Sequence, residues 1–223
     1  FDTDDADAVV FGTDDPALTA SAAPVAGRDV IDGRILITAA VDVSAGAADG
    51  ENFIFVTDNE GNTSGLEAIY DGVSGLTGNA ITGTADTQLS FLAAGGIDVS
   101  TIVGEVAASS ERPDTSGNTV DGDIIIDQGA LALSINDLTA YPAGVVGITA
   151  DAAGSVVVQS TGALTVDDAV TAGDTGFVVL EVDADNTLLT IDDMVSTTDG
   201  EIHYIADDMS LDGTGSGATD ANG

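Results

Sequence analysis

The stretch from Ala163 to Leu211, "ALTVDDAVTAGDTGFVVLEVDADNTLLTIDDMVSTTDGEIHYIADDMSL", contains one short pattern twice. "LTVDD" begins at Leu164, and "LTIDD" begins 25 residues later, at Leu189. A glycine and an alternating apolar run, "GFVVLEV", stand between them. A pattern that returns at such a spacing with both of its element types indicates a repeating fold.

The same two elements can be followed along the chain on both sides of this stretch. Glycine opens a similar run four times, in "GDIIIDQ", "GSVVVQS", "GFVVLEV" and "GEIHYIA", and the second element reads "LSIND", "LTVDD", "LTIDD" and "MSLDG". The glycines are Gly122, Gly154, Gly176 and Gly200, spaced by 32, 22 and 24 residues. A third short strand is expected in three units, at 138–140 ("LTA"), 170–172 ("VTA") and 195–197 ("VST").

Successive side chains of a strand point to opposite faces, so the pattern sorts its residues into columns. The expected inward pairs are Ile124/Ile126, Val156/Val158, Val178/Leu180 and Ile202/Tyr204 in the first element, and Leu133/Ile135, Leu164/Val166, Leu189/Ile191 and Met209/Leu211 in the second. Between the second pairs lies a hydroxyl column of Ser134, Thr165, Thr190 and Ser210, and after them come Asn136, Asp167, Asp192 and Asp212.

These columns predict an all-β fold, specifically a right-handed parallel β-helix (β-solenoid) of short strands with about 20–25 residues per coil. One coil cannot bury its own apolar face, and stacking the coils supplies a continuous core. The right hand follows from the crossover preference of parallel strands. The alternative is an Ig-like β-sandwich surface module, which would also suit an all-β chain.

The predicted organisation has three parts. Residues 1–32 form an acidic N-terminal cap or lead-in, 33–211 form the β-helix with a loop or insertion near 104–121, and 212–223 form a Gly-rich linker or frayed C-terminus. The chain opens with Phe1, and we interpret it as a mature or excised piece of a longer precursor.

Charge excludes several functions. The net charge is −36, from 39 acids, of which 32 are Asp, against the three bases Arg28, Arg34 and Arg112. Such a surface repels nucleic acid and anionic membranes, and it indicates a saline or cation-rich, halophilic or marine, setting. No apolar stretch approaches the roughly 20 residues of a membrane span. Because cysteine is absent, disulfides and thiolate metal sites are excluded.

Three clusters of oxygen-bearing side chains are candidate Ca²⁺ sites, and structural Ca²⁺ is the only cofactor that the sequence suggests. They are Asp2, Asp4, Asp5 and Asp7; Asp58, Asn59, Glu60 and Asn62; and Asp183, Asp185 and Asn186. None completes the twelve-residue EF-hand loop. In a chain with 39 acids such clusters also arise as ordinary solvated surface.

No catalytic residues are expected. The pairs Asp167/Asp168 and Asp192/Asp193 suggest the two carboxylates of a glycosidase, but their recurrence at one place in each coil favours a structural turn. His203 is the only histidine, so a His-based triad or a two-His metal site is impossible. We expect it on the outer surface with Ile125, Val157 and Val179, in a strip that could face a partner; Phe177 is a further outward candidate.

The strands "GDIIIDQGALALSI" and "GSVVVQSTGALTVDDAVTA" resemble the β-helical repeats of very large bacterial surface proteins, the filamentous-haemagglutinin-like exoproteins and giant adhesins. The resemblance covers 122–211 well and 33–105 less well. It implies a secreted, elongated, non-enzymatic stalk or fibre used in adhesion and matrix building. The extreme acidity and the absence of Lys depart from that family.

The sequence thus predicts an extracellular or cell-surface structural segment, a stalk or filament of a bacterial or archaeal surface or matrix fibre. Two alternatives stay open: a Ca²⁺-stabilised adhesin or carbohydrate-binding module, and, more remotely, a polysaccharide-acting β-helix enzyme. The expected partners are further copies, joined end to end or laterally, the continuation of a longer chain, and a glycan or cell-surface receptor. Uncapped β-helix ends favour the first of these.

Overall fold

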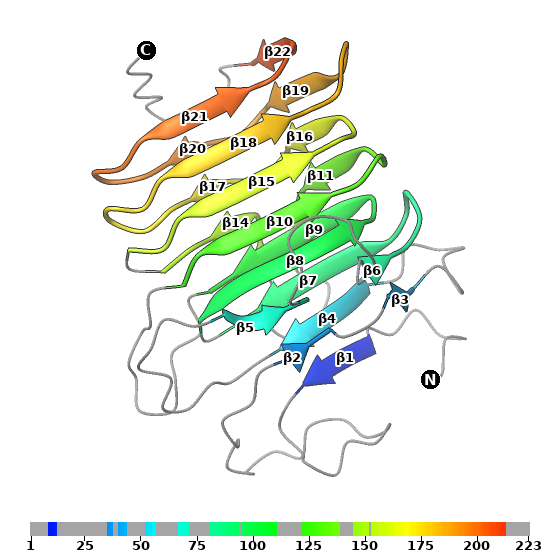
Figure 1. Ribbon diagram of the computed structural model, residues 1–223. Coiled ribbons are helices and arrows are strands. Elements are labelled where there is room, and N and C mark those ends of the chain that lie inside the picture. Colours follow the sequence, from blue (N-terminus) through cyan, green and yellow to red (C-terminus); the bar gives the residue numbers. More distant parts are fainter. Residues whose placement is uncertain are drawn as a thin grey trace.

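The computed structural model describes residues 9–12, 35–37, 40–43, 52–56, 67–71, 81–93, 95–110, 122–138, 145–151 and 153–212. Every regular element in these ranges is a β-strand, and none is a helix (Figure 1). The described part of the chain is therefore all-β, as the sequence predicts.

Two large sheets contain most of the strands, and hydrogen-bonded neighbours within them run parallel. The main path of the eleven-stranded sheet has the order β1 (Val9–Gly12), β4 (Asn52–Val56), β7 (Gln88–Leu92), β9 (Glu105–Ser109), β11 (Leu133–Ile135), β16 (Leu164–Val166), β19 (Leu188–Ile191) and β22 (Asp208–Leu211). The same sheet also contains the short strands β14 (Ile148–Thr149), β17 (Val170–Thr171) and β20 (Val195–Ser196).

The main path of the nine-stranded sheet has the order β2 (Ile35–Leu36), β5 (Glu67–Tyr70), β8 (Gly96–Ile102), β10 (Ile124–Gln128), β15 (Val156–Ser160), β18 (Val178–Val182) and β21 (Ile202–Ile205). This sheet also contains the short strands β3 (Val41–Asp42) and β6 (Ile81–Thr82). Parallel pairing does not fit the antiparallel sheets of an Ig-like sandwich.

The chain passes alternately through the two sheets from β7 onward. We call one strand of the nine-stranded sheet, together with the eleven-stranded-sheet strands that follow it, a rung. Figure 1 shows the rungs lying one above another, with turns at one side leading into the eleven-stranded sheet and turns at the other side leading back.

Like residues lie directly over like residues in successive rungs. Leu164 pairs in register with Leu189, and Leu189 pairs with Met209. The hydroxyl column is also confirmed, because Thr165 and Thr190 are partners and Ser134 and Ser210 continue the column at its two ends. The four-column alignment inferred from the sequence is thus the register of the sheets.

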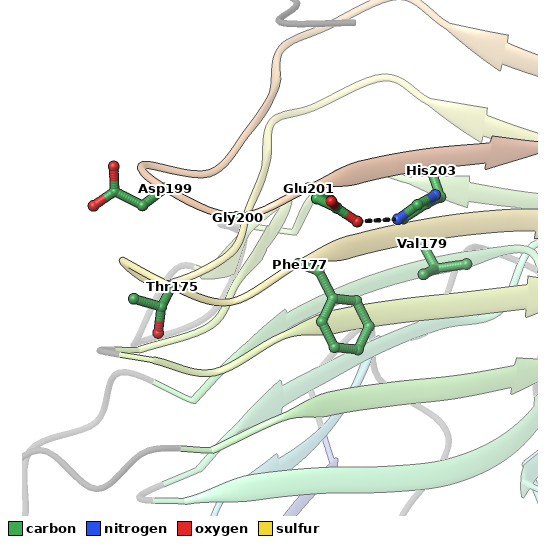
Figure 2. Close-up of a pocket in the computed structure, with 7 residues that line it drawn as sticks. All are labelled: Thr175, Phe177, Val179, Asp199, Gly200, Glu201 and His203. Carbon is green, nitrogen blue, oxygen red and sulfur yellow. Dashed lines mark hydrogen bonds and ion pairs between the residues drawn. The ribbon is translucent and has the colours of Figure 1, made fainter. Parts of the chain in front are cut away.

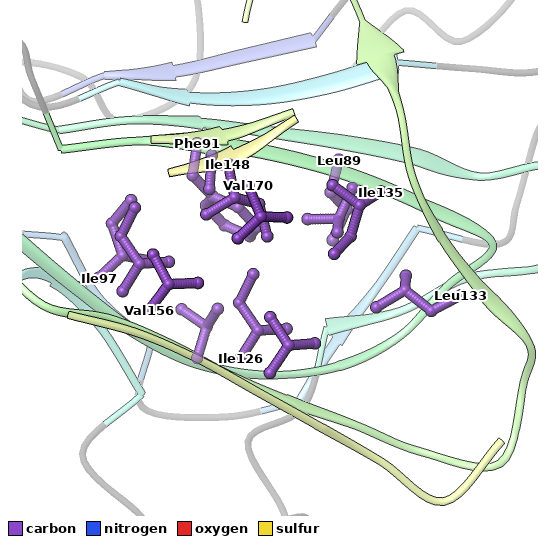
Figure 3. Close-up of a cluster of buried hydrophobic side chains, with 14 of the residues drawn as sticks. Leu89, Phe91, Ile97, Ile126, Leu133, Ile135, Ile148, Val156 and Val170 are labelled. Atoms are coloured by element: carbon purple, nitrogen blue, oxygen red, sulfur yellow. The ribbon is translucent and has the colours of Figure 1, made fainter. Parts of the chain in front are cut away.

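Both sheets contribute their inward side chains to one buried cluster (Figure 3). Ile97, Ile126 and Val156 come from the nine-stranded sheet, and residues such as Leu89 and Phe91 come from the eleven-stranded sheet. The rings of Phe55 and Phe91 stack at 5.3 Å between centroids on neighbouring strands. Full burial of each such side chain contributes about 1.5–3 kcal/mol, so this core is the main source of stability.

The third strand of one unit differs from the prediction. The third strands expected at 170–172 and 195–197 are present as β17 and β20, which pair with each other. The strand that pairs with β17 from the preceding rung is β14, whereas the sequence pattern predicts residues 138–140 in this place. Leu138 instead belongs to β12 (Asp137–Leu138), which forms an antiparallel pair with β13 (Val145–Val146). "LTA" at 138–140 and "ITA" at 148–150 fit the pattern equally well, so the sequence could not show which of them is the third strand of the 32-residue unit that begins at Gly122.

The predicted boundaries fall partly outside the described residues. In the lead-in expected at 1–32, Val9–Gly12 is strand β1 and pairs with β4. The loop expected near 104–121 begins with strand β9, whose Val106 and Ala108 are buried. Residues 111–121 and 213–223 lie outside the described ranges.

Glycines mark the place where adjacent rungs come closest. Gly154, Gly176 and Gly200 precede β15, β18 and β21, and a Cβ atom added at any of them would lie closer than 3.0 Å to the carbonyl oxygen of the glycine one rung below. For Gly176 that oxygen belongs to Gly154, a backbone atom that cannot rotate away. The glycine column recognised in the sequence is therefore a steric requirement of the stacking.

We expect Gly176→Ala to lower the free energy of unfolding by about 1–3 kcal/mol, because the added methyl group forces two rungs apart. Chemical denaturation followed by circular dichroism measures the change. The exposed neighbour Thr175→Ala is the matched control and should unfold like the parent chain. Equal stability of both variants would show that the rungs do not approach closely here.

Candidate functional site: the end rung and the adjacent outer face

The last described rung, formed by β21 and β22 and called here the end rung, exposes residues that its columns bury elsewhere. Met209 is 43% exposed and Leu211 is 61% exposed. Their partners one rung below, Leu189 and Ile191, are only 0% and 6% exposed. The sequence predicted all four as inward, and they are inward by register; Met209 and Leu211 remain exposed because no described rung covers them.

The backbone of the end rung also has an open edge. The N–H groups of Ile124, Val156 and Val178 each donate to a carbonyl oxygen of the strand above, at 2.8–2.9 Å. Ile202 continues that column, so its N–H faces the edge beyond β21. By the same register Met209 continues the column of Leu133, whose N–H also donates to the rung above. Edges of this kind accept further strands.

Tyr204 is the polar residue of the end rung's inner face. It continues the inward column of Val158 and Leu180. Its hydroxyl oxygen is buried and makes no hydrogen bond within the described part of the chain. Burial raises the pKa of Tyr204 above its usual range, because the phenolate form would lose solvation. A buried hydroxyl without a partner is unfavourable and marks an incomplete environment.

A hollow of about 460 Å³ lies on the outer face next to the end rung (Figure 2). Seven residues line it: Thr175, Phe177, Val179, Asp199, Gly200, Glu201 and His203. The ring of Phe177 is 44% exposed there, and His203 Nε2 lies 3.1 Å from Glu201 Oε2. An exposed aromatic ring beside carboxylate and imidazole groups can both stack on and hydrogen-bond to a ligand.

The outer column that contains His203 is confirmed. Ile125, Val157, Val179 and His203 follow one another in register on β10, β15, β18 and β21. The three aliphatic residues are half-buried, whereas the His203 side chain is 52% exposed. His203 therefore sits at the exposed end of an otherwise apolar strip.

The paired aspartates form the same corner in two successive rungs. The backbone N–H groups of Asp167 and Asp168 both donate to the carbonyl oxygen of Ile135, and those of Asp192 and Asp193 both donate to that of Val166. The Asp167 carboxylate also accepts a hydrogen bond of 2.5 Å from the Ser134 hydroxyl. This arrangement supports the structural interpretation of the pairs over a catalytic one.

Stacked corners bring like charges together. The pKa of Asp168 is raised, first because burial removes solvation from its carboxylate and then because Asp137, Asp193 and Asp167 repel it. A hydrogen bond from the backbone of Asp137 opposes the shift. Asp168 is therefore harder to ionise in the folded chain than in the unfolded one.

Of the Ca²⁺ candidates, only Asp183, Asp185 and Asn186 lie among the described residues; Asp2, Asp4, Asp5, Asp7, Asp58, Asn59, Glu60 and Asn62 lie outside them. The three described residues are exposed in the turn between β18 and β19. Asn186 has a φ of 57°, a left-handed conformation that Asn tolerates, and the Thr187 N–H donates to the Ala184 carbonyl at 3.3 Å. Turn geometry is thus sufficient to explain Asn186.

Sequence reasoning expected uncapped ends to pair with further copies, but it did not single out the residues of the end rung, and it missed Thr175, Asp199, Glu201 and the buried hydroxyl of Tyr204. The turn residues become neighbours of Phe177 only through the stacking of β21 on β18. The unit "GEIHYIADDMSL" itself gave no such signal, because it keeps the apolar inward residues of the preceding units.

The raised pKa of Asp168 predicts a pH dependence. The folded chain binds the proton of the Asp168 carboxyl more tightly than the unfolded chain does. The ionised Asp168 side chain therefore destabilises the fold at pH values above its folded-state pKa. This destabilisation disappears as the pH falls to the pKa of the unfolded chain, near 3.8. We expect Asp168→Asn to raise the melting temperature at pH 7 and to leave it little changed near pH 3.5. Thermal melts across this range test it, with the exposed corner variant Asp192→Asn as control; an equal gain at both pH values would contradict the electrostatic cause.

Within the described residues, no group of three or more His, Cys, Asp or Glu side chains is arranged to hold a metal ion. No helix long and apolar enough to cross a membrane was found among them. No protein-family model, curated protein or solved structure matches this chain.

Proposed function

We propose that the chain is a right-handed parallel β-helix and that it serves as a non-catalytic structural segment of an extracellular stalk or filament. The observation that carries the proposal is the register of the columns, which continues without a shift from β8 to β21. For example, Ile97, Ile124, Val156, Val178 and Ile202 follow one another over five strands. Such a stack is quasi-one-dimensional, and length along one axis is what a stalk or fibre uses.

The surface supports an exterior location on a bacterium or archaeon, as in the large surface proteins that the sequence resembles. A net charge of −36 with three basic residues favours a soluble surface in a saline, cation-rich medium and disfavours contact with nucleic acid. The paired aspartates, the most enzyme-like feature of the sequence, serve as corners. The proposal therefore assigns these pairs no catalytic role.

The coiled path can be tested by proximity, because the chain contains no Cys that would interfere. Thr165→Cys with Thr190→Cys places two thiols in register on adjacent rungs, about 4.8 Å apart at the strand spacing. We expect dibromobimane, which becomes fluorescent when it bridges two neighbouring thiols, to label this pair strongly. Thr165→Cys with Ser210→Cys, two rungs apart, is the matched control and should label weakly. Equal labelling would contradict the stacking.

The proposed role is tested on cells that make the protein. Gold-labelled antibodies against the chain should decorate extracellular fibres or the cell surface in electron micrographs. Label confined to the cell interior would contradict the extracellular role, whatever the proximity experiment shows.

The hollow at Phe177 supports a second candidate function, a carbohydrate-binding module. Aromatic rings stack on the apolar faces of sugars, and Asp199, Glu201 and His203 could hydrogen-bond their hydroxyls. We expect neutral glycans to bind better than anionic ones, because the acidic surface repels negative charge. A glycan array probed with the parent chain and with Phe177→Ala tests this role: binding lost in the variant supports it, and binding by neither chain, or equal binding by both, argues against it.

A further inference from the structure

We propose that the end rung binds the end rung of a second copy of this chain about a two-fold axis, with β21 of each copy pairing antiparallel with β22 of the other. The inference rests on the proposed β-helical function and names its partner. Among the candidates for an interaction surface, this one brings together an apolar surface, an open backbone edge and a buried hydroxyl without a partner.

The end rung exposes apolar side chains that a further strand would bury, as strands do in the interior of the stack. Met209 and Leu211 are 43% and 61% exposed at positions that the rung below buries almost completely. On the other strand of the end rung, Ile202 and Tyr204 continue columns whose members in β18 are fully buried. A further strand over each of β21 and β22 would give these residues the environment that their columns have elsewhere.

A two-fold arrangement pairs both strands of the end rung. A two-fold axis along the strand direction places β21 of one copy over β22 of the other, and β22 over β21. The edge of β20, whose strand column ends one rung earlier, lies outside this pairing.

The two end strands match each other in length and in face. Each has four residues, Ile202–Ile205 and Asp208–Leu211. They run in opposite directions through their sheets (Figure 1), and rotation about the strand direction therefore makes them antiparallel across the junction. With full overlap, Ile202 lies opposite Leu211 and Tyr204 lies opposite Met209.

This register also satisfies the backbone. The N–H groups of Ile202 and Met209 face the open edge, and in a strand the residues two positions further on, Tyr204 and Leu211, face the same way. The pairs Ile202–Leu211 and Tyr204–Met209 are then the hydrogen-bonded pairs of an antiparallel ladder. A shift by one residue would bring inward side chains opposite outward ones, so full overlap is the favoured register.

Charge makes the association depend on salt. The end rung and its turns carry the exposed carboxylates of Glu201, Asp207, Asp208 and Asp212. Two copies bring these like charges together, and at about 0.1 M salt the Debye length of about 10 Å leaves part of this repulsion in place. Raising the ionic strength should therefore favour the dimer.

Sedimentation in 0.1, 0.5 and 2 M NaCl tests the dimer. We expect the parent chain to shift with salt from 22.0 kDa toward twice that mass, and no further. Met209→Asp should remain monomeric at every salt concentration. Val146→Asp is the matched control, because Val146 is 44% exposed on β13, outside the end rung, and this variant should dimerise like the parent chain.

The register is tested by mixing two single-cysteine chains, His203→Cys and Ser210→Cys, which full overlap places opposite each other. A disulfide-linked dimer that forms in the mixture and not with either chain alone supports the proposal. A parent chain that stays monomeric in all salts, or a ladder of larger multimers, would overturn it. Monomers that still label strongly at the Thr165/Thr190 cysteine pair would refute only the dimer; weak labelling of that pair would refute the β-helix itself.

Discussion

In-register hydrogen bonding between parallel strands is the constraint on which the rest of this molecule depends. A parallel ladder with no shift places each residue over the same position of the neighbouring rung. A residue type that packs well at one position of a rung therefore packs well at the same position of the next rung. Where the backbones come closest the column must be glycine, as at Gly154, Gly176 and Gly200. Where the ladder faces the core the column must be aliphatic, as at Val156 and Val178.

The acidic residues follow the same logic at the corners. Asp167 and Asp192 take the position after a short strand, where two successive N–H groups must reach one carbonyl oxygen of the rung below. Asp suits such tight bends, but stacking brings its charge close to the acids of neighbouring rungs, Asp137 and Asp193, and Asp168 shows the consequence in its raised pKa. Corner geometry and charge repulsion therefore oppose each other, and the surrounding salt decides how strongly.

Most of the fold between Gly122 and Leu211 could be predicted from the sequence, because the columns encode register directly. The misplaced third strand shows where this information ends. "LTA" at 138–140 and "ITA" at 148–150 carry the same apolar and hydroxyl pattern, and only pairing with β17 distinguishes them. The hollow at Phe177 could not be predicted either, since Asp199 and Glu201 approach the ring through stacking and not through sequence proximity.

The end rung combines the residue types of an interior rung with an exposed position among the described residues. Terminal units of stacked repeats usually carry polar residues at inward positions. In the unit from Gly200 to Leu211, Ile202, Met209 and Leu211 are instead residues of the kind that interior rungs carry. The hydroxyl of Tyr204 is the one polar group at these positions, and it is buried without a partner within the described residues. The proposed pairing of β21 with β22 of a second copy would cover these interior-type residues of the last described rung.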